Sequence, residues 1–140
     1  MGHLQESGGM AEKRHFAFEN TPLDSVFAHG GSRPILTRRV LEAKMGTAVN
    51  FIDFTIVPAG SDIGVHTHSH DNEEMYIIIS GQGEMDVNGQ RSLVGPGHVI
   101  INRPGGSHGL KNTGDTDLYM VVIEVPVTPR QRESSSWQAG

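Results

Sequence analysis

Apolar and polar residues follow one another in short runs over the central part of the chain, from about residue 35 to residue 126. The runs are rich in β-branched and aromatic residues, and no window carries apolar residues at helical spacing. We expect strands at 35–41, 48–57, 63–68, 73–80, 83–87, 98–102, 108–112 and 118–125. Clusters of Gly, Pro and Asn separate them, and Asn88-Gly89 is typical of a two-residue hairpin turn. The pattern predicts an all-β domain with little helix, folded as a sandwich or small barrel.

The two ends of the chain lack this alternation. Residues 1–15 begin with a polar, glycine-rich stretch and are expected to form a flexible leader. Residues 129–140 are polar and are expected to form a flexible tail. A single domain is therefore predicted over 16–128, with a short helix or an edge strand near 23–27.

Composition restricts the chemistry that this domain can support. The chain has no cysteine, so a bound metal would need nitrogen and oxygen ligands. The formal charge of −5 and the scattered basic residues argue against a nucleic-acid partner. No apolar run is long enough for a membrane-spanning helix, and we expect a soluble, cytoplasmic protein.

Histidines gather in one stretch, "HTHSHDNEE", at residues 66–74. His66 and His68 stand two apart, so on a strand they share a face. Glu74 lies on the next predicted strand, and His108 follows a glycine-rich corner far along the chain. Two strands and that corner could bring the four side chains together, and we predict a metal site. Isolated histidines, such as His15, His29 and His98, are expected to be ordinary surface or core residues.

Two spaced motifs in this region resemble those of the cupin superfamily. The first consists of Gly60, His66, His68, Glu74 and Gly81. The second consists of Gly97, Pro104, Gly105, His108 and Asn112. The resemblance covers about residues 35 to 126 and implies a cupin-type double-stranded β-helix, a jelly-roll barrel.

The spacing departs from the first motif at one place. Five residues separate His68 from Glu74, one more than the motif allows. Glu73 could replace Glu74, or His68 and His70 could form the histidine pair. We favour His66, His68, Glu74 and His108 as the metal ligands, because a loop absorbs an insertion more easily than a strand does. His70 is then a loop residue near the mouth, a candidate fifth ligand or acid–base group.

Three imidazoles and one carboxylate suit one divalent transition metal, Fe, Mn, Ni, Co or Zn. Tyr76, two residues beyond Glu74, should point inward and is a candidate general acid or base. The resemblance implies an enzyme that acts on a small organic molecule, with a dioxygenase favoured. Alternatives are a lyase, isomerase, dehydratase or cyclase, and a non-catalytic metal-dependent binding or sensor protein. Small cupins also often form homodimers, which we expect here.

Further expectations concern the walls of the site. The apolar face of Ile52, Phe54 and Ile56 is expected to pack between the sheets, which leaves Asp53 beside the cavity or outside. Arg38 and Arg39 point to opposite faces, so one could look inward and favour an anionic substrate. A ligating histidine usually donates a hydrogen bond from its other ring nitrogen, and the candidate acceptors are Asp53, Asp62 and Asn112.

Overall fold

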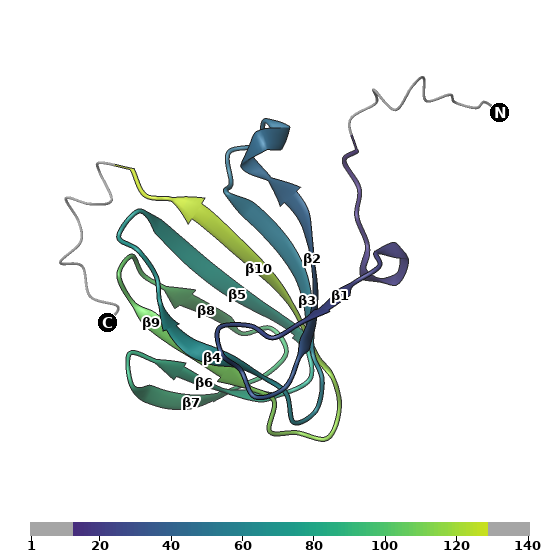
Figure 1. Cartoon of the computed structure of the whole chain (residues 1–140), viewed down its shortest axis with the longest axis vertical. Helices are drawn as coiled ribbons and strands as arrows, with labels where there is room; N and C mark the ends of the chain where they lie inside the picture. The colour runs from purple at the N-terminus through teal and green to yellow at the C-terminus, as the bar shows by residue number, and fades with distance from the viewer. Residues whose placement is uncertain (1–12, 129–140) are drawn as a thin grey trace.

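A computed structural model, which describes residues 13–128, folds as two antiparallel sheets that face each other (Figure 1). The six-stranded sheet has the order β1-β2-β3-β10-β5-β8, and the four-stranded sheet has the order β4-β9-β6-β7. The strands are β1 (Asp24–Val26), β2 (Ile35–Glu42), β3 (Phe51–Val57), β4 (Asp62–Thr67), β5 (Asn72–Ser80), β6 (Gly83–Val87), β7 (Gln90–Val94), β8 (Val99–Asn102), β9 (Ser107–Lys111) and β10 (Leu118–Pro126). Two short 3₁₀ helices, η2 (Phe18–Asn20) and η3 (Ala43–Met45), complete the described elements. The all-β, cupin-type architecture predicted from the sequence is confirmed.

Most of the predicted strands lie where the apolar runs placed them. The predicted leader falls largely, and the predicted tail wholly, outside the described residues. An edge strand, β1, lies within the segment for which a helix or a strand was expected. The strand β7 was missed because four of its five residues are exposed, so it carries no apolar face to detect. The hairpin at Asn88-Gly89 joins β6 to β7, and both turn residues have the positive φ angles that such a turn requires.

Alternation along β5 divides its side chains between the inside and the outside. Glu74, Tyr76 and Ile78 are 6%, 3% and 1% exposed and point between the sheets. Their neighbours Met75 and Ile77 lie on the outer face. The core around them combines apolar side chains from both sheets, among them Val57, Met85, Leu110, Leu118 and Met120. The faces predicted for β5 are therefore confirmed.

The face of β3 that was predicted to pack between the sheets is wrong, although Asp53 takes one of the two places expected for it. Thr55 and Val57 are 2% and 0% exposed, and Phe51 packs against the core, so Asp53 belongs to the inner face with them. Ile52, Phe54 and Ile56 lie on the outer face instead. Hydrophobic residues could not identify the inner face, because this sheet is apolar on both faces. Near the site its inner face is the more polar one.

The outer face of the six-stranded sheet carries two apolar rows, which we call the outer rows. Phe54, Val121, Ile77 and Val99 are neighbours across β3, β10, β5 and β8. Ile52, Ile123, Met75 and Ile101 form the second row. Phe18 covers one end by stacking on Phe54, with 4.3 Å between ring centroids. At the other end Val99 and Ile101 are 56% and 41% exposed. Exposed apolar patches of this kind are typical of protein–protein contacts.

We expect a second copy of the chain to cover the β5–β8 end of the outer rows. The double variant Val99→Asp/Ile101→Asp should then elute from gel filtration at half the apparent mass of the unmodified protein, because buried carboxylates oppose association. Leu93→Asp is the matched control, since Leu93 is 76% exposed on the other sheet. A monomer mass for the unmodified protein would contradict the expectation.

Among the described residues, no helix combines the length and apolarity needed to cross a membrane.

Candidate metal centre

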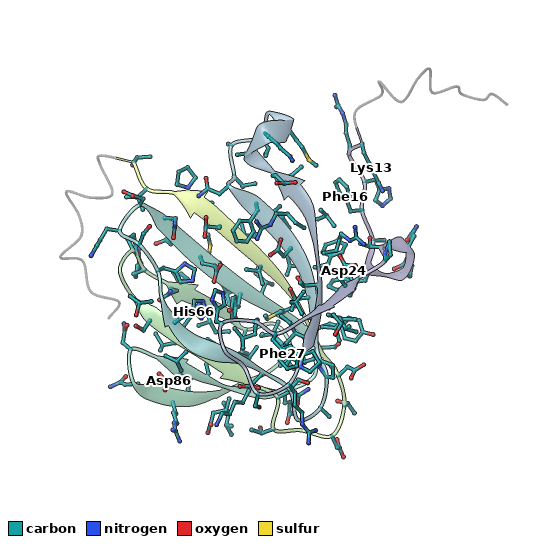
Figure 2. All side chains as sticks on the ribbon, in the orientation of Figure 1. Lys13, Phe16, Asp24, Phe27, His66 and Asp86 are labelled. Atoms are coloured by element: carbon teal, nitrogen blue, oxygen red, sulfur yellow. The ribbon has the colours of Figure 1, made fainter. Side chains whose placement is uncertain are left out.

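Four side chains from three strands converge between the two sheets. His66 lies on β4, His68 just after it, Glu74 on β5 and His108 on β9. Each contributes one potential ligand atom, and these atoms all lie within 4.8 Å of one another. Figure 2 labels His66, which β4 carries. The structure thus brings together the four residues that the sequence analysis favoured as metal ligands.

A register irregularity turns the histidines inward. The pairing of β4 with β9 shifts between Ile63 and His66. Ile63 is buried while Val65 is exposed, and beyond the shift His66 faces inward, opposite His108 on β9. Bulges of this type re-aim side chains next to functional sites. Without the shift, strict alternation from Ile63 would direct Val65 and Thr67 at the site.

Hydrogen bonding fixes the orientation of the His66 ring. Nδ1 of His66 lies 2.7 Å from the carbonyl oxygen of Gly64, so in the neutral ring Nδ1 carries the proton and Nε2 keeps its lone pair. That Nε2 lies 3.0 Å from Nε2 of His68, which is itself 3.2 Å from Oε1 of Glu74. Nε2 of His108 lies 2.9 Å from the same oxygen.

A cation suits this donor set. Three ring nitrogens and one carboxylate oxygen are aimed at one small volume, and His66 can offer no proton there. One proton on His68 would have to serve both the His66 nitrogen and the Glu74 oxygen. A divalent ion would satisfy all four atoms at once, and these are the ligand types that transition metals accept. The cluster can therefore hold a metal.

The second ring nitrogens of His68 and His108 do not meet the acceptors that the sequence analysis expected. Nδ1 of His68 lies 3.4 Å from Oδ1 of Asn72 and 3.9 Å from Oε1 of Glu124. Nδ1 of His108 is buried and has no hydrogen-bond partner among the described residues.

The three acceptors proposed from the sequence serve elsewhere, and that expectation is wrong. Asp53 pairs with Arg39, Asp62 accepts from the backbone of Ser32, and Asn112 bonds the backbone of β3 and of a turn. Spacing along the sequence could not distinguish these roles, because each partner lies on another segment.

The insertion after His68 is absorbed by the loop. Glu73 faces away from the cluster and pairs with Arg103 at 3.1 Å, whereas Glu74 is buried within the cluster. His70 is exposed on the loop, and it does not belong to the cluster of four. Its ring lies against Gly105, where a Cβ would come within 2.4 Å of a ring atom, and the φ of +78° at Gly105 itself favours glycine. The structure thus brings Glu74, not Glu73, to the three histidines.

Tyr76 forms a wall of the cluster. Its ring is buried and lies 4.6 Å from that of His108, centroid to centroid. Burial raises the pKa of the Tyr76 phenol well above its ordinary value, and the charges of Glu74 and Asp53 act in the same direction. At neutral pH the phenol keeps its proton.

A fourth imidazole, that of His29, lies beside the cluster, although the sequence analysis treated His29 as an ordinary isolated histidine. His29 stacks on His66 with 3.5 Å between ring centroids and 9° between ring planes. Burial lowers the pKa of His29. Its φ of 52° is unusual for a residue other than glycine, and such conformations often occur at functional sites. The following glycine pair was the one hint of an irregular backbone, and it did not indicate a contact with β4.

The pKa of His66 is lowered to about 4, mainly because burial disfavours the charged ring. We therefore expect the metal-free protein to lose stability as the pH falls from about 6.5 toward 4. In that window the unfolded chain protonates this imidazole and the folded chain does not, so acid favours unfolding. Urea midpoints at several pH values measure the effect. His66→Asn should weaken the pH dependence while His15→Asn keeps it, and equal slopes for all three proteins would contradict the assignment.

Comparisons with known proteins agree with the fold. A model of the cupin domain matches residues 53–124. The oxalate-binding protein of Thermotoga maritima is 36% identical over 67 residues, which are 48% of this chain and 54% of that protein. The chain thus spans about half the length of the curated relatives that it matches.

Solved structures show the same architecture. A crystal structure of a predicted oxalate decarboxylase from Thermotoga maritima has a TM-score of 0.76 and 24% identity, and the match covers 81% of this chain and 100% of the other. The Cnp3 cupin domain of Schizosaccharomyces pombe has a TM-score of 0.69 and 14% identity, with coverages of 89% and 82%. At these identities the structural likeness concerns the fold alone.

Proposed function

Because the chain belongs to the cupin family, we propose that it is a metal-dependent protein that binds a small organic acid beside the four-residue centre. The observation that carries the proposal is the convergence of His66, His68, Glu74 and His108 within 4.8 Å. Four protein ligands leave free positions on an ion that prefers six. An oxygen-donor ligand would use those positions.

The chain's own groups would hold the metal and shape the ligand's surroundings. When bound, a divalent ion supplies Lewis-acid chemistry and a positive charge that attracts a carboxylate. Tyr76 retains its proton and can donate a hydrogen bond from the buried wall. His70, exposed on its loop, stays a candidate acid–base group, as the sequence suggested.

Arg39 contributes less to anion binding than the sequence suggested. It lies opposite Asp53 in the pairing of β2 with β3 but is exposed, and its Nε and Nη2 lie 2.8 and 3.1 Å from the two carboxylate oxygens of Asp53. Its guanidinium also lies over the Phe51 ring, 3.7 Å from the centroid. Because Asp53 neutralises this cation, the charge of an acidic ligand would be met mainly by the metal.

The name of the Thermotoga relative, an oxalate-binding protein, favours oxalate or a similar diacid as the ligand. Oxalate places two oxygens at chelating distance, which suits a metal with adjacent free positions. A lyase that cleaves such an acid fits the same site. The dioxygenase-type activity expected from the sequence stays a prediction, and oxygen uptake with small electron-rich substrates would test it.

Calorimetric titration tests the proposal. Protein loaded with Mn(II) or Co(II) should bind oxalate at one molecule per chain, and acetate, which has a single carboxylate, much more weakly. Metal-free protein is the control, and it should bind neither acid. Failure of the loaded protein to bind oxalate, malonate or other small diacids would contradict the proposed ligand class. Carbon dioxide release from bound oxalate would distinguish a lyase from a binding protein.

A further inference from the structure

A short segment before β2 lies across the strand that carries the histidine pair. We call residues 28–33 the strap. Its Ala28 carbonyl accepts a hydrogen bond from the backbone N–H of Gly64 at 3.1 Å. The backbone of His29 crosses so close that a Cβ on Gly64 would lie 2.1 Å from the His29 carbonyl oxygen. The strap therefore packs on Gly64, the residue whose backbone carbonyl orients the His66 ring.

The strap is anchored at its other end by one carboxylate. Oδ1 of Asp62 accepts from the backbone N–H and the hydroxyl of Ser32, both at 2.8 Å, and from the backbone N–H of Arg33 at 3.3 Å. Gly31 passes close to the Asp62 carbonyl, where a Cβ would lie 2.4 Å from the oxygen. Because β4 is an edge strand, the strap occupies the side that no other strand pairs. Hydrogen bonds at both ends of the strap, to Gly64 and to Asp62, thus attach it to β4.

This attachment lays the His29 ring flat on His66. With 3.5 Å between centroids and 9° between planes, His29 covers one face of the His66 imidazole. His29 contributes no atom to the group of four converging residues, although its ring lies against the ring of one of them. Its contribution is therefore contact with the ring of a ligand.

We propose that His29 is a positioning residue: held by the strap, it restrains the His66 imidazole in its ligating orientation and slows the release of the bound metal. The inference rests on the proposed metal centre. Since Nδ1 of His66 is already held by Gly64, stacking removes the remaining freedom of the ring to tilt. An aromatic contact of this kind corresponds to about a threefold to tenfold effect on an equilibrium or rate.

The test is chelator-driven release of Co(II) from the loaded full-length protein. His29→Asn removes the ring and keeps a residue that tolerates positive φ, so it should release Co(II) about tenfold faster. His29→Phe restores a flat ring and should return release most of the way toward the unmodified rate. Asp62→Ala frees the strap without touching either ring and should accelerate release in the same direction. His15→Asn is the matched control, because His15 is exposed.

The outcomes separate this inference from the proposed function. If the unmodified protein takes up no Co(II), the metal centre itself is overturned. If it binds Co(II) and His29→Asn releases it within twofold of the unmodified rate, the role of His29 is overturned and the metal centre stands. Release from His29→Phe as fast as from His29→Asn would overturn stacking as the cause. Thermal melting of each metal-free variant verifies that the fold persists.

Discussion

Replacing His108 by alanine is expected to lower the affinity for a divalent metal by more than about 100-fold, since loss of an outer-shell partner alone costs 10- to 100-fold. His108 is fully buried, and its Nε2 is directed at the carboxylate of Glu74 at 2.9 Å, so no other side chain can take its place. Competition titration with a metal indicator measures the affinity. Circular dichroism of the metal-free variant shows whether the barrel has folded.

His70→Ala is the matched control for His108→Ala. It removes an imidazole of the same stretch whose ring lies against Gly105 and outside the cluster, so we expect an affinity within about threefold of the unmodified protein. A loss comparable with that of His108→Ala would contradict the choice of His66 and His68. It would support the other pair weighed from the sequence, His68 and His70.

Asn112→Ala is expected to lower the free energy of unfolding by about 2–4 kcal/mol, because it leaves buried backbone groups without partners. The Asn112 side chain, 3% exposed, donates to the carbonyls of Val57 and Thr116, both at 2.8 Å, and accepts from the N–H of Gly114 at 2.9 Å. It thereby fastens the end of β9 to β3 and to the following turn. Urea denaturation of the metal-free protein gives the value.

Asn20→Ala supplies the comparison for that change. Asn20 is exposed at the end of η2, and its replacement should alter stability by less than about 0.5 kcal/mol. Equal stability of the two variants would show that Asn112 does not hold these segments together. A loss of metal affinity in Asn112→Ala at unchanged stability would instead return Asn112 to the metal site.

Side-chain patterns within single strands predicted much of the fold and of the site. Alternation along β5 predicted that Glu74 and Tyr76 face inward, and the spacing of His66 and His68 predicted that they share a face. The glycine-rich corner placed His108 on a later strand, which the structure pairs with β4 so that His108 stands opposite His66. Local periodicity therefore predicted which way these side chains face, and the two spaced motifs predicted which of them meet.

Contacts between distant segments could not be obtained in the same way. The strap contacts β4 across at least 29 residues of sequence, so nothing near His29 indicated its contact with His66. The inner face of β3 was assigned wrongly because Ile52 and Phe54 lie on the outer face, and hydrophobicity alone does not distinguish a core face from an apolar outer face. The acceptors for the ligand rings were also missed, since one of them, the Gly64 carbonyl, belongs to the backbone.

Metal content is the most direct test of the central claim, that His66, His68, Glu74 and His108 form a metal centre. The protein should be purified without chelator or affinity metal, analysed by elemental mass spectrometry, and analysed again after incubation with Mn(II), Co(II) or Zn(II) and desalting. We predict close to one ion per chain, and far less for Glu74→Gln. Absence of any ion before and after incubation, in protein that is folded by circular dichroism, would contradict the claim.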